Sequence, residues 1–339
     1  MENERTVQIE KSTPQLPEDL KRIMTKQGYH FVGKHSAIKT CNYTAESMRL
    51  DGATCYKHQF YGIQSWRCMQ STPAIGCNLA CSFCWRIIPE EIGINWNELN
   101  ALGNWDDPDS IVDGLIAEQR KLVSGFKENP KTDLRRWKEA NDPAHVALSL
   151  TGEPMFYPLM SKLLDAFHRR NISTFLVTNG TMVGALKKLT VMPTQLYVSI
   201  QAPNKEIYEQ TARAKTLNAW QNFQEFLSLF STLATRRVFR LTLVKGANMI
   251  DTKGYADLIA KGKPDYVEVK GFSYVGGARG EARDLSYEQM PRKEEIIDFA
   301  ATLAKESGYI VADYHEHSKV VLLCADENAI SNRLLHFQK

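Results

Sequence analysis

The positions of hydrophobic and polar residues alternate between two patterns from about residue 70 onward. Short apolar runs rich in β-branched residues predict strands, and each run is followed by a stretch whose apolar residues recur at helical spacing. Such alternation is typical of βα units around a parallel sheet. Six units of this kind predict an α/β fold, an incomplete (β/α)6 TIM-like barrel rather than a closed barrel of eight strands.

The predicted barrel strands lie at 70–75, 145–150, 174–177, 196–200, 239–244 and 266–269. The main predicted helices lie at 109–124, 159–170, 205–211, 220–233, 251–261 and 291–307. Two later runs, at 309–313 and 319–323, predict a closing pair of strands.

The chain before the barrel follows neither pattern. Its first forty residues are polar and contain Pro14 and Pro17, which predicts a loosely organised start with one short helix at 18–27. The following stretch interleaves aromatic residues with cysteines, as expected where metal ligation stabilises the fold. We therefore expect an N-terminal extension over 1–60, a core barrel over 61–310 and a C-terminal extension over 311–339.

Length and composition limit the class of protein. A chain of 339 residues suffices for one large barrel domain with extensions. Its apolar runs are too short to cross a membrane, and residues 1–10 lack the apolar segment of a signal peptide, so we expect a cytoplasmic protein without membrane contact. Six of the seven cysteines fall between Cys41 and Cys84, which in a reducing compartment indicates metal binding rather than disulfides.

The net charge is only +3, but the positive charge is concentrated. Residues 161–250 contain twelve Lys and Arg against four Asp and Glu. This excess suits a polyanionic partner such as RNA. The alternative is that basic pairs end surface helices and complement their dipoles. The basic residues concerned are Arg169, Arg170, Lys187, Lys188, Arg236, Arg237 and Arg240.

Cys77, Cys81 and Cys84 have the spacing C-x3-C-x2-C. Three thiolates can hold a 4Fe-4S cluster and leave one iron without a protein ligand. An open position on a metal is where a substrate or cofactor binds, and the neighbouring Phe83 would shield the cluster from water. The alternatives are a zinc knuckle with a remote fourth ligand, or three unrelated buried cysteines.

This loop resembles that of the radical S-adenosylmethionine (SAM) superfamily, in which an aromatic residue precedes the last cysteine of the motif. The resemblance implies that the open iron binds SAM, and that the reduced cluster cleaves SAM to give a 5′-deoxyadenosyl radical.

Polar residues follow the predicted strands, at the edge where a β/α barrel carries its chemistry. The segment at 151–154 resembles the Gly-Gly-Glu motif of the same superfamily, with Thr151 in the first place. Each such residue could also simply end a strand or form a turn. The residues that we expect to bind SAM are Gly152, Glu153, Thr178, Asn179, Ser199, Gln201 and Asn248. Glu268 and Lys270, on one face of the sixth strand, are either part of the site or a solvated pair.

A second set of cysteines, Cys41, Cys55 and Cys68, precedes the barrel. They could be ordinary buried thiols, whereas together with the barrel they indicate ligands of a second cluster with an open iron. Lys57 follows Cys55 by two residues and could form a Schiff base with a carbonyl compound bound there. Its alternative is an exposed lysine. Cys324 is remote from both sets and is expected in the core.

The cysteine trio with Lys57, followed by Cys-x-Phe-Cys-Trp-Arg at 81–86, resembles the archaeal tRNA 4-demethylwyosine synthase family. Further similar stretches lie at 150–154, 197–203, 268–271 and 320–323. The resemblance implies two 4Fe-4S clusters. Since the flavodoxin-like domain of eukaryotic relatives is not found here, it also implies an external one-electron reductant of the flavodoxin or ferredoxin type. We expect a monomer.

The resemblance also implies a reaction. The radical removes hydrogen from the methyl group of 1-methylguanosine, next to the anticodon of tRNA-Phe, and the methylene radical adds to pyruvate held at the second cluster. Loss of the pyruvate carboxyl carbon and ring closure give the tricyclic 4-demethylwyosine, which makes the enzyme formally a carbon–carbon lyase in wyosine biosynthesis. The base must leave the anticodon stack, and candidates to contact the loop are Trp85, Arg86, Arg279 and Arg283. Two alternatives remain: another radical SAM enzyme with an auxiliary cluster, and a non-catalytic zinc-dependent RNA-binding protein.

Overall fold

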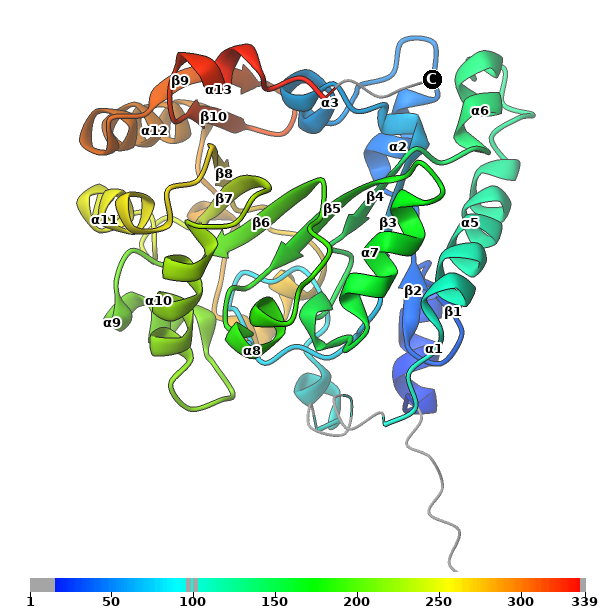
Figure 1. Cartoon of the computed structure of the whole chain (residues 1–339), viewed down its shortest axis with the longest axis horizontal. Helices are drawn as coiled ribbons and strands as arrows, with labels where there is room; N and C mark the ends of the chain where they lie inside the picture. The colour runs from blue at the N-terminus through cyan, green and yellow to red at the C-terminus, as the bar shows by residue number, and fades with distance from the viewer. Residues whose placement is uncertain (1–15, 96–98, 100–102, 336–339) are drawn as a thin grey trace, which may run out of the picture.

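A computed structural model describes residues 16–95, 99 and 103–335 (Figure 1). Within these residues one curved sheet contains all ten named strands, in the order β1-β2-β3-β4-β5-β6-β7-β8-β10-β9. Its six central strands are parallel, and they are β3 (Cys68–Thr72), β4 (His145–Leu148), β5 (Ser173–Thr178), β6 (Gln195–Ile200), β7 (Arg236–Leu243) and β8 (Tyr266–Gly271). They confirm the incomplete six-unit barrel, since the same six strands are predicted from the sequence.

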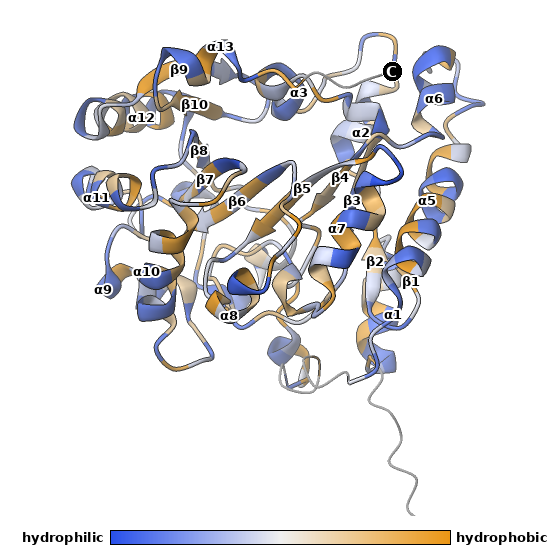
Figure 2. Cartoon of the chain, in the orientation of Figure 1, coloured by the Kyte–Doolittle hydropathy of each residue, from blue (hydrophilic) through white to orange (hydrophobic). Residues whose placement is uncertain are grey.

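Helices cover the outer face of this sheet (Figure 1). They are α5 (Pro108–Ser124), α7 (Met160–His168), α8 (Val183–Lys187), α10 (Ala219–Phe230), α11 (Thr252–Gly262) and α12 (Lys293–Ser307). Two further helices pack elsewhere: α6 (Leu134–Ala140) beside α5, and α9 (Lys205–Ala212) against Leu79 in the cysteine loop. Apolar residues on the long helices alternate with polar ones at helical spacing, so one side packs on the strands and the other meets water (Figure 2). Burial of this outer core is the main source of stability.

The inner face of the sheet carries a second apolar cluster. Ala147, Phe175, Tyr197 and Val238 point inward from neighbouring strands and pack against α3 (Tyr56–Tyr61). Because side chains alternate along a strand, the residues two positions further on, including Ser199 and Arg240, also face inward. Helix α3 therefore closes the inside of the barrel near the beginnings of the strands and leaves the strand ends to the functional groups.

Both edges of the parallel sheet are extended by antiparallel strands. β1 (His30–Val32) and β2 (Ser36–Ile38) form a hairpin that pairs with β3. On the other edge β10 (Val320–Cys324) pairs with β8 and with β9 (Ile310–His315), which confirms the predicted closing pair, and α13 (Glu327–Ser331) follows. The edges of the open barrel are thus covered by short strands.

The N-terminal extension is more ordered than its sequence indicates. The predicted short helix is present as α1 (Glu18–Lys26), but the prediction of a loose start over the first forty residues misses the β1-β2 hairpin. The next stretch, which shows no clear period, contains the short helix α2 (Asn42–Ser47). Strands of three residues are too short to show an alternation of polar and apolar positions; β1 pairs with β2, and β2 with β3. Residues 1–15, which include Pro14, and residues 336–339 lie outside the described part of the chain.

None of the helices in the described residues combines the length and the hydropathy that a bilayer crossing needs. The longest, α5, has seventeen residues and exposes a charged side.

Candidate active site at the ends of the parallel strands

The loop that carries Cys77, Cys81 and Cys84 follows β3 and lies against the end of α9. Backbone N–H groups of Ala80 and Ser82 donate hydrogen bonds to the carbonyl groups of Ala212 and Thr211, at 3.0 and 2.9 Å. From the other side, the N–H group of Glu153 donates to the carbonyl oxygen of Gly76 at 2.8 Å. The cysteine loop is therefore held by the segments that follow β4 and β6, which places its thiols at the carboxyl ends of the strands.

Arg283 fixes the inside of this loop. Its guanidinium group is fully buried and donates hydrogen bonds to the carbonyl oxygens of Cys81, Cys84 and Arg86, at 3.2, 2.7 and 2.9 Å. It also forms an ion pair with Glu91, of η2 (Pro89–Ile92). The prediction that Arg283 contacts RNA is wrong, because all of its donors are used inside the protein.

The other predicted RNA contacts divide into two groups. Arg86 is buried and donates a hydrogen bond to the hydroxyl oxygen of Tyr29 at 2.8 Å, and burial lowers its pKa to about 10. Its guanidinium group lies against the ring of Trp85 and only 6% of the residue is exposed, so little of it is accessible to an RNA loop. Trp85 is 40% exposed and Arg279 lies on the surface, so both remain available to a partner.

Glu153 connects the ends of β4 and β5. Its buried carboxylate accepts hydrogen bonds from the Thr178 hydroxyl and from the backbone N–H of Asn179, both at 2.7 Å, and from the N–H of Met155 at 3.1 Å. Burial raises the pKa of Glu153 to about 7 in spite of these donors. The side chain of Asn179 in turn donates to Asn78 at 2.8 Å and reaches the sulfur of Cys77 at 3.8 Å. Three of the predicted SAM-binding residues thus form one network beside the first cysteine.

Gly152 permits the close approach between this network and the cysteine loop. Its φ angle is +71°, which favours glycine, and a Cβ atom there would lie 2.3 Å from the carbonyl oxygen of Ala74 and 2.6 Å from that of Ile75. Since both neighbours are backbone atoms, they cannot move aside without displacing the loop.

We expect Gly152→Ala to displace the cysteine loop and to lower the iron content of purified protein by at least about half, together with a lower Tm. The matched control is Gly184→Ala, because Gly184 lies in α8 and a Cβ there meets nothing within 4 Å. Iron analysis and thermal unfolding check both variants. Full iron content in Gly152→Ala would show that the loop tolerates the shift.

The remaining predicted SAM-binding residues lie at the ends of β6 and β7 with different roles. Ser199 faces the barrel interior, in register with Arg240. Gln201 is buried, and its Oε1 atom has no hydrogen-bond partner within the described residues, so it retains an acceptor for a ligand. Asn248 instead uses its side chain on the backbone of Val244, Gln201 and Thr242, and it is fully buried. Its amide therefore holds strand ends together, and its contact with SAM stays a prediction.

The second cysteine trio gathers near the beginning of β3. Cys41 and Cys55 immediately precede the short helices α2 and α3, and Cys68 is the first residue of β3. Burial raises the pKa of Cys55 to about 11 and that of Cys68 to about 12, while the positive charge of Lys57 lowers both; Cys41 raises both, and Cys55 raises that of Cys68. The three thiols and Lys57 are therefore within electrostatic range of one another.

Lys57 points into the barrel rather than to solvent. Its side chain is 7% exposed, and its ammonium nitrogen lies 5.2 Å from the ring centre of Tyr197 and 5.5 Å from that of Phe175. Such aromatic faces stabilise a cation. The alternative reading of Lys57 as an exposed lysine is wrong.

A buried ion pair between Arg240 of β7 and Glu268 of β8 lies next to helix α3, which carries Lys57. Glu268 accepts hydrogen bonds from the hydroxyl groups of Tyr56 and Tyr61, at 3.0 and 2.9 Å, and from Arg240 at 3.0 Å. Arg240 also donates to the hydroxyl oxygen of Tyr56 at 2.9 Å. Glu268 is 1% exposed, so it belongs to the interior and not to a solvated pair. These bonds fix α3, and with it both Cys55 and Lys57, against β7 and β8.

Both trios have the chemistry that an iron–sulfur core requires. The six thiols are free and partly buried. In the loop after β3, burial raises the pKa of Cys77 to about 12 and that of Cys81 above its usual range, and the neighbouring sulfurs add to this effect. Thiols in such surroundings lose their protons only when a metal supplies the opposing charge. Within the described residues no three His, Cys, Asp or Glu side chains lie close enough for one metal ion. A cubane cluster differs from a single ion, because it binds each thiolate to a different iron.

Cys324 is fully buried in the core, as predicted.

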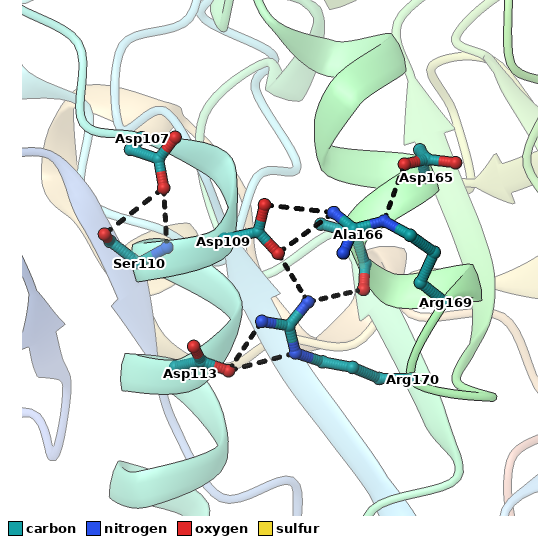
Figure 3. Close-up of polar contacts among 8 residues, drawn as sticks. All are labelled: Asp107, Asp109, Ser110, Asp113, Asp165, Ala166, Arg169 and Arg170. Carbon is teal, nitrogen blue, oxygen red and sulfur yellow. Dashed lines mark hydrogen bonds and ion pairs between the residues drawn. The ribbon is translucent and has the colours of Figure 1, made fainter.

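The basic residues of 161–250 are largely paired with acids or backbone groups. Arg169 and Arg170 at the end of α7 bind Asp109, and they also bind Asp165 and Asp113 (Figure 3). Arg237 pairs with Asp265, and Lys187 with Glu225. Arg236 donates to carbonyl oxygens of residues 332 and 333. Most of these basic residues therefore pair with groups of the protein itself, which favours the alternative over an RNA interface.

We therefore expect the double substitution Arg169→Gln, Arg170→Gln to lower the Tm modestly but to leave tRNA affinity and its salt dependence unchanged. The charges that it removes already face carboxylates that connect α5 with α7 (Figure 3). Arg279→Gln is the matched comparison, since Arg279 forms no ion pair within the described residues and should contribute to the salt slope. Filter binding at several salt concentrations measures both.

Sequence reasoning missed several residues of the site. Tyr56, Tyr61, Phe175 and Tyr197 enclose Lys57 or hold Glu268, yet by residue type they look like core positions. The one sequence signal is alternation along β5 and β6, which places Phe175 and Tyr197 on the face opposite the main core, whereas Tyr56 and Tyr61 lie on α3. For Arg283 the sequence suggested RNA as the partner, whereas its guanidinium group binds carbonyl oxygens of the cysteine loop.

Two family models match the chain. The radical SAM superfamily matches residues 71–259, and wyosine base formation matches residues 261–325. The first match covers more than half of the chain and includes the cysteine loop and the strands β4 to β7. The fold and the open cysteine trio thus define a radical SAM protein.

The relatives narrow the class. The S-adenosyl-L-methionine-dependent tRNA 4-demethylwyosine synthase of Pyrococcus abyssi is 42% identical over 93% of this chain and 91% of its own. Among solved structures, TYW1 with a lysine-pyruvate adduct bound has a TM-score of 0.81 at 30% identity and covers 95% of this chain and 98% of its own. An archaeal TYW1 has a TM-score of 0.76 at 29% identity, covering 95% of this chain and 100% of its own. The chain belongs to the family of S-adenosyl-L-methionine-dependent tRNA 4-demethylwyosine synthases.

Proposed function

We propose that the chain forms 4-demethylwyosine from pyruvate and the 1-methylguanosine next to the anticodon of tRNA-Phe. Its membership in the family supports this activity, and so does the similarity over nearly the whole length of a Pyrococcus enzyme that bears this name. The observation that carries the proposal is the position of Lys57. It is an enclosed amine beside the second cysteine trio, in a fold whose solved relative has a lysine-pyruvate adduct.

The proposal assigns the six clustered cysteines to two 4Fe-4S clusters. Cys77, Cys81 and Cys84 would hold the cluster that binds SAM. Bound SAM, together with the reduced cluster, would supply a 5′-deoxyadenosyl radical. Cys41, Cys55 and Cys68 hold the second. The proposed boundaries at 60 and 310 divide the chain into an extension that contributes Cys41 and Cys55, a barrel whose first strand contributes Cys68, and a C-terminal extension.

The residues at the strand ends prepare a place for SAM. The network of Glu153, Thr178 and Asn179 keeps the backbone after β4 and β5 rigid beside Cys77. Since the Glu153 carboxylate already accepts three protein hydrogen bonds, we assign it a positioning role and leave the neighbouring backbone to contact the cofactor. The free acceptor of Gln201 and the inward-facing Ser199 complete the polar lining.

Lys57 captures pyruvate as an imine. Its amine nitrogen forms a bond to the ketone carbon, the ketone oxygen leaves as water, and the carboxylate of pyruvate stays intact in this step. Enclosure by Tyr56, Phe175 and Tyr197 limits the access of water, which would hydrolyse the imine. The arrangement holds the keto acid between the second trio and the strand ends.

The remaining partners follow from the reaction. The guanine must be unstacked from the anticodon loop and enter the barrel from the strand ends, where the exposed Trp85 is suited to stack on RNA bases. We propose an external one-electron reductant of the flavodoxin or ferredoxin type, a monomeric enzyme and a place in the cytoplasm. Because a carbon–carbon bond of pyruvate is broken, we class the enzyme as a lyase.

The proposal is tested by anaerobic incubation of reconstituted protein with SAM, reductant, pyruvate and tRNA that contains 1-methylguanosine. Digestion and mass spectrometry of the nucleosides should show a new tricyclic nucleoside that requires all four components. If none forms while SAM is cleaved, the chain is a radical SAM enzyme with another substrate.

A further inference from the structure

A second lysine shares the interior of the barrel with Lys57. Lys270 lies on β8 two residues beyond Glu268 and four beyond Tyr266, so all three side chains leave the strand on the same side. Tyr266 belongs to the apolar cluster on the inner face of the sheet, and Glu268 binds Tyr56 of α3. Lys270 therefore faces inward, one step nearer to the strand ends than Glu268.

The charge around Lys270 is unbalanced. Burial lowers the pKa of Lys270 most, Arg240 and Lys57 lower it further, and the sulfur of Cys55 and the carboxylate of Glu268 raise it, so all of these groups are within electrostatic range. Glu268 is the carboxylate among them, and its two oxygens are already occupied by Tyr56, Tyr61 and Arg240. Lys57, Arg240 and Lys270 thus share one carboxylate, that of Glu268, whose two oxygens already accept hydrogen bonds.

The backbone of Lys270 pairs within the sheet, but its side chain has no hydrogen bond or ion pair with any residue in the described part of the chain. It is nevertheless only partly exposed, and a cation in such a place is costly unless an anion pairs with it. An iron–sulfur cluster on Cys41, Cys55 and Cys68 would offset part of the positive charge. A small anion that entered the barrel from the strand ends would offset the remainder.

We propose that Lys270 binds the carboxylate of the α-keto acid whose ketone carbon reacts with Lys57. The inference rests on the proposed function, because it takes pyruvate as the compound that Lys57 captures. Pyruvate has two functional groups on adjacent carbons, and the two lysines give each group its own partner: the amine of Lys57 for the ketone and the ammonium group of Lys270 for the carboxylate. Lys270 is thus a specificity-determining residue that selects keto acids over neutral ketones.

The test traps the imine with borohydride and measures the lysine adduct by mass spectrometry, without tRNA or SAM. Reconstituted wild-type protein and the variants Lys270→Met and Lys270→Gln are titrated with pyruvate and, separately, with the neutral diketone butane-2,3-dione. Lys270→Arg keeps the charge. Lys305→Met is the matched control, since Lys305 lies on the exposed side of α12.

We expect Lys270→Met to raise the pyruvate concentration for half-maximal trapping about ten- to a hundredfold, the loss of one charge-assisted hydrogen bond. Trapping of the neutral diketone should change much less, so that the preference for pyruvate collapses, and Lys270→Arg should restore part of it. Equal loss with both ketones would indicate a merely structural lysine and would overturn the inference. Should Lys270→Met fail to fold, Lys270→Gln and Lys270→Arg decide the matter by the same ratio. Absence of any adduct in the wild-type protein would instead contradict the proposed function.

Discussion

Replacement of Lys57 by arginine should reduce formation of the tricyclic nucleoside by at least about a thousandfold. Arginine keeps the positive charge beside Cys55 and Cys68, but its guanidinium group cannot form an imine with a ketone. Cleavage of SAM should continue, because the cysteine loop after β3 is untouched. Mass spectrometry of the nucleosides and of 5′-deoxyadenosine in the same reaction measures both results.

The control for this experiment is Lys305→Arg, a like exchange on the exposed surface of α12, which should behave as the wild type. A Lys57→Arg protein that still makes the nucleoside at more than a tenth of the normal rate would show that pyruvate reacts without becoming attached to the protein. The cation and not the amine would then be the contribution of residue 57.

Single cysteine replacements should separate the two clusters. Reconstituted wild-type protein should contain about eight iron atoms per chain, and both Cys81→Ala and Cys55→Ala should contain about four. Cys81→Ala should lose cleavage of SAM altogether, since it destroys the open trio after β3. Cys55→Ala should still form 5′-deoxyadenosine but no tricyclic nucleoside. Anaerobic iron and sulfide analysis, together with the two product assays, measures these outcomes.

Cys324→Ala is the matched control for both, because Cys324 is fully buried in the apolar cluster against which Cys55 and Cys68 pack but belongs to neither trio. It should keep all of the iron and lose a small amount of stability through the missing sulfur. If Cys55→Ala retained as much iron as this control, Cys55 would not be a ligand, and the second cluster would have to be abandoned.

The barrel could be predicted from the sequence because its signal is repeated. Each strand of the parallel sheet is a short apolar run and each return helix has its own apolar stripe, so an error in one unit does not change the fold. The predicted position at 239–244 differs from β7 (Arg236–Leu243) because the strand begins with two arginines, whose charges are paired outside the apolar core. The trio of Cys77, Cys81 and Cys84 was equally accessible, since its spacing is local.

What the sequence could not show is which polar groups are already in use. Asn248 and Arg283 have the residue types of ligand contacts, but the fold surrounds them with backbone carbonyl groups. In the same way, the sequence at Arg169 and Arg170 suggests a basic surface. In the fold, Asp109 and Asp113 of α5 pair with these two arginines. Such pairings join residues that are far apart in the chain, and no periodicity records them.

The surroundings of Lys57 are also not predictable from the sequence. It depends on α3, a helix of six residues, and on tyrosines that reach Glu268 more than two hundred residues later in the chain. Sequence reasoning could propose the amine chemistry of Lys57 from its distance to Cys55. The aromatic enclosure and the nearby Lys270 become visible only when β5 to β8 are placed side by side.

The measurement that tests the account most directly follows single carbons of pyruvate into tRNA. In anaerobic reactions of the reconstituted protein with SAM, reductant and tRNA that contains 1-methylguanosine, [3-¹³C]pyruvate should give a tricyclic nucleoside one mass unit heavier. [1-¹³C]pyruvate should give the same nucleoside without label, because the carboxyl carbon is lost. Retention of the label from the carboxyl carbon, or a nucleoside that gains no label from either form, would contradict condensation with pyruvate at Lys57.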